Sequence, residues 1–236
     1  MTVLGIDTAG AAASVALVQE EHVIASLYVR QSSAFARPVL RSIDLILNGA
    51  GYELADLTGL AVNIGPGAFT GLRVGLALAH GLALASAKPL VGCSTFDALV
   101  ALVPEWQGMI CPVIEARKGE VYAAFYRRQH GVTQQTTPGM VVTPERLCAH
   151  ITERTLLVGS GVQVYGTAFT AALGSRVVCR AAAEEEVALA VSLARLGASR
   201  LRVETPEGLP MPQPLYIRPA DARLPRHHVG TAEVVS

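Results

Sequence analysis

The segment at residues 60–87 constrains the fold more than any other part of the sequence. Leu60 to Ile64 is an apolar run with the length of a buried strand, and the glycine-rich loop Gly65-Pro66-Gly67-Ala68-Phe69-Thr70-Gly71 follows it. A long apolar stretch then continues to about Ala87 and stops before Lys88-Pro89, which predicts a helix. A strand, a loop and a helix in this order indicate an α/β protein.

Strands and helices alternate in the same way along the rest of the chain. The N-terminal residues predict a three-stranded antiparallel meander at 3–6, 14–19 and 23–29. The predicted helices start near residues 38, 70, 95, 144, 162 and 184, with Ser94 or Thr95 and Thr143 as caps, and the remaining predicted strands lie at 60–64, 90–92, 109–114, 121–127, 156–158 and 177–179. The character of the sequence changes at 104–108, so we expect an N-terminal lobe at 1–104, a C-terminal lobe at 105–205 and a Pro-rich tail at 206–236. With 236 residues, of which 51% are hydrophobic, the chain is long and apolar enough for two cores.

The glycine-rich loop is a candidate anion site. Glycines directly after a strand allow close backbone approach, and the helix that follows directs free N–H groups and a positive dipole end outwards. A tight structural turn would use the same glycines. The loop lacks the Gly-Lys-Ser/Thr of a Walker A motif and the GxGxxG spacing of a dinucleotide fold.

Asp7 and Thr8 end the first predicted strand, ahead of the small-residue turn Ala9 to Ala13. A carboxylate and a hydroxyl at this place resemble the first phosphate loop of the actin, hexokinase and Hsp70 superfamily. The alternative is that both side chains cap the hairpin turn with hydrogen bonds. The candidate nucleotide- or phosphate-binding set is therefore Asp7, Thr8, Gly65, Gly67, Thr70 and Gly71.

The helix after the glycine loop has one face of very small residues. Gly71 and Gly75 are four residues apart, and Ala79 and Ala83 continue the same face. Glycine within a helix costs about 1 kcal/mol relative to alanine, so a smooth face is expected to serve close packing, either on this chain's own sheet or on another subunit's helix. The candidate partner interface is Val39, Ile43, Ile46, Leu72, Gly75, Ala79 and Ala83. On this hypothesis Gly75→Leu prevents association and leaves the monomer folded.

No catalytic or metal-binding motif is present in the sequence. The six histidines include no HxxxH or HxxH pair with a nearby acid, and there is no Gly-x-Ser-x-Gly elbow or Cys/His nucleophile arrangement. The four cysteines form no CxxC pair and lie in apolar runs, as expected of cysteines that pack as small hydrophobes. We therefore predict no catalytic residues and no metal site in this chain.

The charges cancel, with 19 Lys and Arg against 19 Asp and Glu. A neutral chain lacks the excess of cations that drives binding to nucleic acid or anionic membranes. The start of the sequence lacks the basic segment of a signal peptide, and the apolar stretch at 74–87 is shorter than the roughly 20 residues of a membrane span. We expect a cytoplasmic chain with no membrane contact, which would meet RNA only through a partner.

Several motifs together resemble the bacterial TsaB family, also called YeaZ. They are Leu4-Gly5-Ile6-Asp7-Thr8, Ser14-Val15-Ala16-Leu17, the Gly65–Gly75 element, Glu115-Ala116-Arg117-Lys118-Gly119-Glu120-Val121-Tyr122, Gly159-Ser160-Gly161 and Pro214-Leu215-Tyr216-Ile217-Arg218, in this order over residues 3–218. The chain departs from the family pattern at Ala68, at Gln31-Ser32-Ser33 and at Glu115. These departures weaken the case for independent nucleotide chemistry more than they weaken the case for the fold.

The resemblance implies a two-lobed actin-like ATPase (ASKHA, ribonuclease H-like) fold and a part in threonylcarbamoylation of the adenosine next to the anticodon in tRNA. In that family TsaB is a degenerate relative of the catalytic subunit TsaD, which holds a metal through an HxxxH helix. TsaB dimerises with TsaD, and the ATPase TsaE joins them. The resemblance therefore implies a non-catalytic subunit that needs no cofactor of its own, with ATP or ADP at the complex, with tRNA held by other subunits and with a homodimer left open for the isolated chain.

Two other functions compete with this interpretation. An active ATP-dependent phosphotransferase of the same superfamily would need an acidic second phosphate loop, and Gly159-Ser160-Gly161 has no carboxylate beside it. A peptidase, a label attached to relatives of this fold, would need a nucleophile or a metal site.

Overall fold

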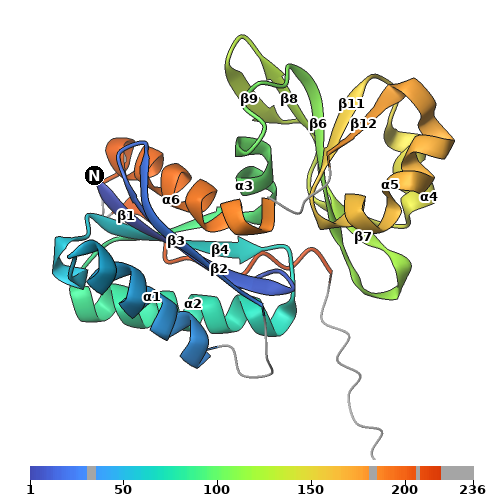
Figure 1. Cartoon of the computed structure of the whole chain (residues 1–236). Coiled ribbons are helices and arrows are strands. Elements are labelled where there is room, and N and C mark those ends of the chain that lie inside the picture. The colour runs from blue at the N-terminus through green and yellow to red at the C-terminus, as the bar shows by residue number, and fades with distance from the viewer. Residues whose placement is uncertain (31–35, 181–184, 206–207, 219–236) are drawn as a thin grey trace, which may run out of the picture.

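The computed structural model describes residues 1–30, 36–180, 185–205 and 208–218, which form two lobes, each built on a β-sheet (Figure 1). The strands are β1 (Thr2–Asp7), β2 (Ala12–Gln19), β3 (His22–Arg30), β4 (Gly59–Gly65), β5 (Leu90–Ser94), β6 (Gly108–Glu115), β7 (Val121–Ala123), β8 (Tyr126–Gln129), β9 (Val132–Gln135), β10 (Met140–Val142), β11 (Thr155–Val158) and β12 (Val177–Arg180). The helices are α1 (Ala36–Ala50), α2 (Phe69–Ser86), α3 (Thr95–Ala101), α4 (Pro144–His150), α5 (Ser160–Leu173) and α6 (Glu185–Val203), with short 3-10 helices at Leu54–Asp56, Arg117–Gly119 and Gly174–Arg176. The predicted α/β fold with mixed sheets is confirmed.

The N-terminal sheet has the strand order β3-β2-β1-β4-β5. Its first three strands form the predicted antiparallel meander, and β4 and β5 add to β1 in parallel. Side chains alternate between the two faces because the strand period is two residues. Leu4 and Ile6 pack with α1 and α2 on one face, whereas Val3 packs on the opposite face with Leu193 and Ala194 of α6.

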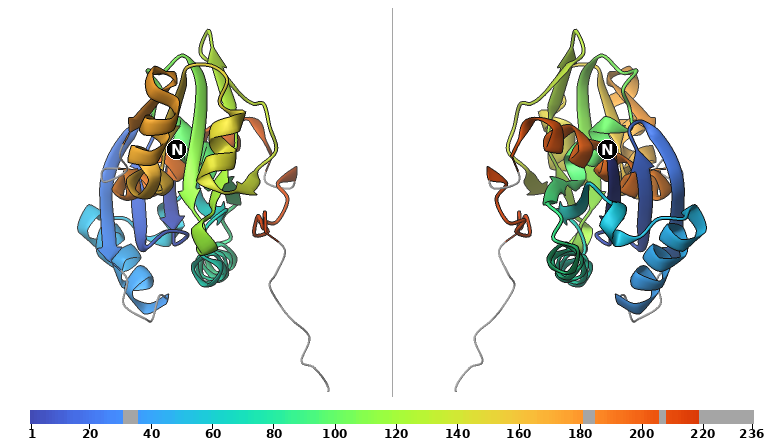
Figure 2. Two further views of the ribbon diagram at one scale, coloured as in Figure 1. Left: turned by 90° about the vertical axis from the view of Figure 1, so that its right-hand side faces the viewer. Right: turned by 90° about the vertical axis from the view of Figure 1, so that its left-hand side faces the viewer.

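Helices α1 and α2 lie on the side of this sheet that faces away from the C-terminal lobe (Figures 1 and 2). Helix α6 covers the other side, and it approaches β1 so closely that a Cβ atom at Gly5 would collide with the carbonyl oxygen of Ala190. This position corrects the predicted lobe boundaries, because the helix assigned to the C-terminal lobe at 105–205 packs on the N-terminal sheet. The change in sequence character at 104–108 shows where the chain leaves the N-terminal lobe. It does not show that the chain later returns to that lobe.

The C-terminal sheet has the order β10-β7-β6-β11-β12, and β8 and β9 extend from β6. One face packs on α4 and α5 through residues such as Cys111 and Leu157, and the other packs on α3 through Ile110 and Leu156. The strand predicted at 121–127 is divided in two, since β7 pairs with the end of β6 and β8 with its start. The caps agree with prediction: Ser94 accepts a hydrogen bond from the backbone N–H of Asp97, and Thr143 accepts one from Arg146.

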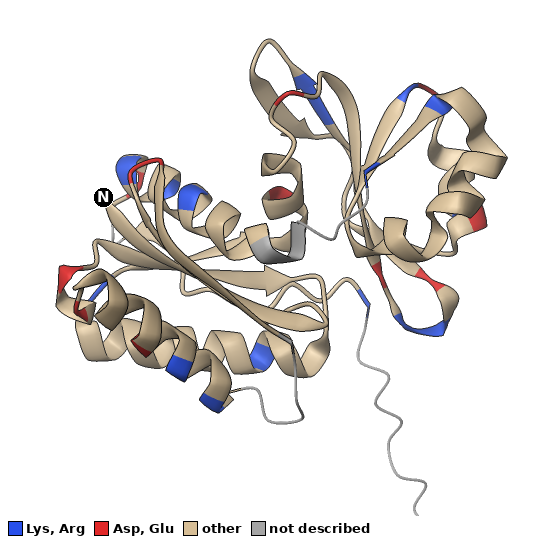
Figure 3. Cartoon of the chain, in the orientation of Figure 1, with Lys and Arg blue, Asp and Glu red and all other residues tan. Residues whose placement is uncertain are grey.

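Helix α2 is, within the described ranges, the one helix whose length and composition would allow it to cross a membrane. It packs on β4 of the N-terminal sheet, and the helices of protein cores meet the same two criteria. Positive and negative side chains are distributed over both lobes, but α2 carries a single charged residue, Arg73 (Figure 3). The predicted tail lies partly outside the described residues, and its described part, 208–218, runs between the two lobes.

Candidate functional site

The turn after β1 holds the first two candidate residues, Asp7 and Thr8, and both are buried. Asp7 Oδ1 accepts hydrogen bonds from the backbone N–H of Ala9 at 3.0 Å and from Asn63 Nδ2 at 2.8 Å. The Thr8 hydroxyl donates to the carbonyl oxygen of Gly71 at 2.8 Å. The bond from Ala9 is the turn cap that the sequence left open for Asp7, whereas the other two bonds link the turn to β4 and to the first turn of α2.

The glycine loop packs directly on this turn. The N–H of Ala68 donates to the carbonyl oxygen of Ala9 at 2.7 Å, and a Cβ at Gly67 would lie 2.5 Å from that same oxygen. A Cβ at Gly71 would collide with the carbonyl oxygen of Thr8. These glycines therefore permit close contact between two loops of the chain itself.

A buried polar cluster supports the loop from behind. Asn63 Oδ1 accepts from the N–H of Gly65 at 2.8 Å and from the hydroxyl of Thr95 at 2.9 Å, and the same hydroxyl lies 2.7 Å from the carbonyl oxygen of Pro66. Sequence reasoning missed Asn63, although one polar residue in the otherwise apolar run of β4 was the available signal, and it considered Thr95 only as a helix cap. Both are almost fully buried, and polar groups at such positions require partners.

Ser14 is the one described residue with a buried side-chain oxygen that has no hydrogen-bond partner. It lies opposite Asp7 in the β1–β2 register, so the two side chains share a face of the sheet. Its hydroxyl is the group that a bound molecule could satisfy at this end of the sheet. The six predicted nucleotide-site residues are thus brought to one region, with Thr70 exposed and the others turned to internal packing.

The interface prediction is wrong for six of its seven residues. Their side chains lie inside the N-terminal lobe, where Val39, Ile43 and Ile46 of α1 and Leu72, Gly75 and Ala79 of α2 pack on the sheet. A Cβ at Gly75 would collide with the Thr8 hydroxyl. The smooth glycine face therefore serves this chain's own fold, and Gly75→Leu would damage the monomer. Ala83 alone is half-buried.

The free face of α2 is a different stripe of the same helix. The exposed residues are Phe69, Thr70, Arg73, Ala77, Gly81, Leu84 and Ala85, mostly at helical spacing. Leu84 is 85% exposed, and a Cβ at Gly81 would meet nothing within 4 Å. Helix α1 lies beside α2 and exposes Leu45 to 64% (Figure 1). This stripe consists mainly of small and apolar residues and carries one charge, Arg73.

The corresponding turns of the C-terminal lobe are also built for packing. Ser160, at the start of α5, accepts a hydrogen bond from the N–H of Glu115 at 3.1 Å. A Cβ at Gly159 would lie 2.6 Å from the carbonyl oxygen of Val113, and one at Gly161 would lie 2.6 Å from a methyl group of the same valine. The Gly-Ser-Gly motif thus seats α5 on β6.

Metal ligands do not gather in the described part of the chain, where no group of three or more His, Cys, Asp or Glu side chains could hold an ion. The cysteines there have no disulfide partners. Burial raises the pKa of the Cys93 thiol to about 12 and lifts the pKa of Cys111 well above its usual range, so both remain protonated and act as core residues.

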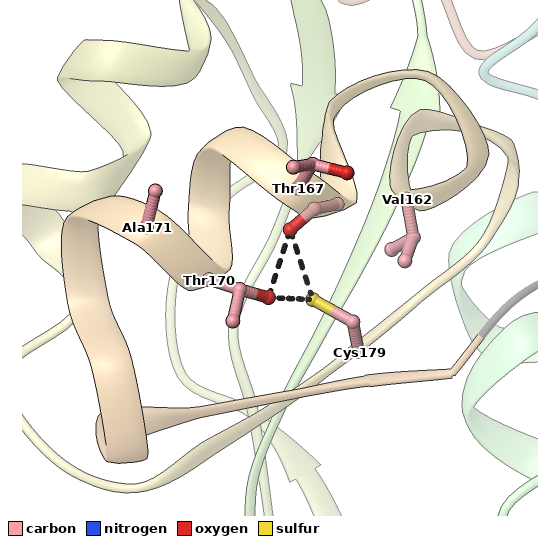
Figure 4. Close-up of a pocket in the computed structure, with 6 residues that line it drawn as sticks. Val162, Thr167, Thr170, Ala171 and Cys179 are labelled. Carbon is pink, nitrogen blue, oxygen red and sulfur yellow. Dashed lines mark hydrogen bonds between the residues drawn. The ribbon is translucent and has the colours of Figure 1, made fainter.

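An open pocket of about 550 Å³ lies on the C-terminal lobe between α5 and β12 (Figure 4). Cys179 Sγ and Thr170 Oγ1 are 3.7 Å apart, and each is also within hydrogen-bonding distance of the carbonyl oxygen of Gly166. The other lining residues are Val162, Thr167 and Ala171, and the pocket is mainly apolar. It offers no group with the geometry of a nucleophile and base.

Comparison with known proteins finds relatives whose descriptions concern threonylcarbamoyladenosine in tRNA. A family model described as TsaD, tRNA N6-adenosine threonylcarbamoyltransferase, matches residues 29–223. The chain is similar to the tRNA threonylcarbamoyladenosine biosynthesis protein TsaB of Bacillus subtilis, with 35% identity over 58% of this chain and 60% of that protein. It is 36% identical to TsaB of Escherichia coli over 61% and 64% of the two chains, and 30% identical to TsaB of Buchnera aphidicola over 67% and 78%. The chain spans less than two thirds of the length of the first two relatives.

Solved structures cover more of the chain. A protein described as similar to the peptidase YEAZ from Pseudomonas aeruginosa has a TM-score of 0.71 and 28% identity, over 92% of this chain and 99% of its own. YeaZ from the same organism has a TM-score of 0.68, 25% identity and coverage of 91% and 99%. A ROK hexokinase of Thermus thermophilus, at 12% identity and a TM-score of 0.54, shares the fold over 84% of this chain. The expected actin-like ATPase fold is thereby shown.

Proposed function

The chain belongs to the TsaB (YeaZ) family, and on this premise we propose that it is a non-catalytic subunit required for threonylcarbamoylation of tRNA adenosine next to the anticodon. Its role is to bind and activate a TsaD-like transferase, with a TsaE-like ATPase as a third component. Transfer of the threonylcarbamoyl group takes place on the partner. The chain works in the cytoplasm and meets tRNA only through the complex.

The exposed stripe of α2 is the observation that carries this proposal. Leu84 of α2 and Leu45 of the neighbouring helix α1 project into solvent. Ala77 and Gly81 are small exposed residues of α2, so a second helix could approach α2 closely there. Small residues allow helices to pack closely, and burial of apolar area supplies the free energy of association. We place the contact with the TsaD-like subunit here, on the opposite side of α2 from the residues first predicted. The same stripe could pair two copies of the isolated chain.

The internal contacts of the glycine loop and of the β1–β2 turn support a non-catalytic role. Asp7 Oδ1 and the Thr8 hydroxyl bind other parts of the N-terminal lobe, and the loop glycines contact the β1–β2 turn. The residues present therefore fit a phosphate or a metal–nucleotide poorly at this loop, and no chemical step is assigned to it. The rival phosphotransferase would need these groups to face a bound nucleotide.

The test is to deplete this chain in cells that depend on it and to measure threonylcarbamoyladenosine in tRNA hydrolysates by mass spectrometry. The modified nucleoside should fall as the chain is depleted and return when the wild-type chain is expressed again. A constant level under full depletion would reject the proposed role. Calorimetry of the purified chain with Mg-ATP separates the rival, since a phosphotransferase must bind the nucleotide without partners.

A further inference from the structure

The described C-terminal segment, 208–218, contacts three residues of the N-terminal lobe, which are Gly92, His80 and Ile64. The ring of Pro212 lies against Gly92 of β5, where a Cβ would be 2.9 Å from the proline ring, and its carbonyl oxygen is 3.1 Å from Nε2 of His80 in α2. Three residues later, the N–H of Leu215 donates to the carbonyl oxygen of Ile64 at 2.7 Å. The segment therefore follows β5 and reaches the end of β4 where the glycine loop begins.

Tyr216 then joins the first turn of α2. The Arg73 guanidinium lies 3.6 Å from the centre of the Phe69 ring, and Arg73 Nε donates to the Tyr216 hydroxyl at 3.1 Å. The two rings are 5.5 Å apart. A cation above an aromatic ring and a tilted ring pair each stabilise contacts at such distances. These three side chains clamp the segment to the start of the helix.

The last two described residues contact the C-terminal lobe. Ile217 packs against Gly139, where a Cβ would be 2.7 Å from the terminal carbon of Ile217 and 3.0 Å from the ring of Phe96. Arg218 forms an ion pair with Glu120 and donates to the carbonyl oxygen of Arg117 at 3.3 Å. The side chains of this pair are only 18% and 31% exposed, so solvent screens it less than the other ion pairs between residues that the structure describes.

We propose that residues 212–218 are a strap that fixes the angle between the two lobes. The chain crosses between the lobes at two other places, after α3 and before α6, and two crossings define an axis about which one lobe can rotate. Helix α3 packs on both α6 and β6, and the strap adds to this packing a third connection with its two ends on different lobes, which restricts this rotation. Two-lobed folds that bind ligands between the lobes commonly close by such a hinge.

The strap also fixes the local geometry of α2. In the N-terminal lobe, the strap contacts Ile64, which lies directly before the glycine loop, and Phe69 and Arg73, which lie in the first turns of α2. Release of the strap would therefore free the lobe angle and the start of α2 together, while the sheet cores stay intact.

Hydrogen exchange and a distance measurement on the full chain test the strap. Arg218→Ala removes the ion pair, and Arg127→Ala, which breaks the exposed pair with Glu153 within the C-terminal lobe, is the matched control. Spin labels at Leu45→Cys on α1 and Val164→Cys on α5, in a background with Cys148 and Cys179 replaced by alanine, report the lobe angle. Both labelled positions are exposed.

Arg218→Ala should make the Leu215 amide exchange about tenfold faster and broaden the distance distribution, while amides of β1 and β4 keep their protection. The exchanged pair Glu120→Arg with Arg218→Glu should restore both readouts. The proposal is overturned if Arg218→Ala matches the control in both measurements. Equal loss of protection in β1 and β4 would also overturn it, because the segment would then be part of the core rather than a separable strap.

Discussion

Thr8 is the residue on which the close packing of the N-terminal lobe depends. Its hydroxyl donates to Gly71, and its atoms occupy the positions where side chains at Gly71 and Gly75 would begin. Gly81 lies on the same helix but has open space around it. Two glycines one and a half turns apart therefore have opposite roles, one in packing and one at the surface, which spacing alone does not distinguish.

Substitution at these two glycines should change stability in opposite directions. Gly75→Ala must displace Thr8 and should lower the free energy of unfolding by at least about 2 kcal/mol. Gly81→Ala should raise it by about 0.5–1 kcal/mol, because alanine is a better helix former and meets no atom. Urea denaturation of both variants and the wild type gives the comparison. Equal effects would show that the packing of α2 on the β1–β2 turn is misplaced.

A variant at Asp7 that keeps the two hydrogen bonds to Oδ1 can show whether these bonds stabilise the turn. Ala9 and Asn63 both donate to the same oxygen, Oδ1, which asparagine also has. Asp7→Ala leaves two buried donors without that acceptor, and we expect it to be less stable than Asp7→Asn by about 1–3 kcal/mol. Thermal or urea unfolding measures the difference. If the two variants are equally stable, the hydrogen bonds do not hold the turn.

The cysteines should react with thiol reagents according to their burial. Cys93 and Cys111 lie in the cores with raised thiol pKa values, whereas Cys179 is half-buried at the open pocket. Because the thiolate is the reactive form, alkylation of the native protein at about pH 8 should modify Cys179 and spare the other two. Mass spectrometry of tryptic peptides identifies the modified residues. Modification of Cys93 at the rate of Cys179 would contradict the core assignment.

At the scale of elements, local patterns predicted most of the fold. The meander, α1, α2 and the caps at Ser94 and Thr143 follow from alternation, helical spacing and side-chain hydrogen bonding, which act over a few residues. The orientation of α2 was not predictable in this way. Apart from Arg73 and His80 it consists of apolar or small residues on every side, so its sequence does not identify which face covers the sheet.

The exposed stripe of α2 should be necessary for association with the partner. Gly81→Arg places a long cation where an approaching helix would lie and leaves the monomer core untouched. Co-purification with a TsaD-like subunit should be lost for this variant. Val164→Arg, at an exposed apolar position on α5, is the control and should keep the partner. Retention of the partner by Gly81→Arg would move the interface elsewhere.

At the scale of the whole molecule, long-range contacts determine what local patterns cannot. Helix α6 returns to the first lobe and packs on β1 through Gly5, and Leu215 reaches back to Ile64. Both contacts join residues more than 140 positions apart, so neither composition nor spacing indicates them. The candidate site shows the same limit: the sequence found Asp7 and Thr8, but only the fold showed that Asn63 and the α2 helix occupy their hydrogen bonds.

The central claim is that this chain acts through a helix surface and not through its glycine loop. The most direct test is the rate of threonylcarbamoyladenosine formation in a reaction reconstituted from this chain, a TsaD-like transferase and a TsaE-like ATPase, with Asp7→Asn and Gly81→Arg compared in the same assay. We predict that Asp7→Asn stays within about twofold of the wild type and that Gly81→Arg falls by more than about tenfold. Full activity of folded Gly81→Arg together with loss of activity in folded Asp7→Asn would contradict the account.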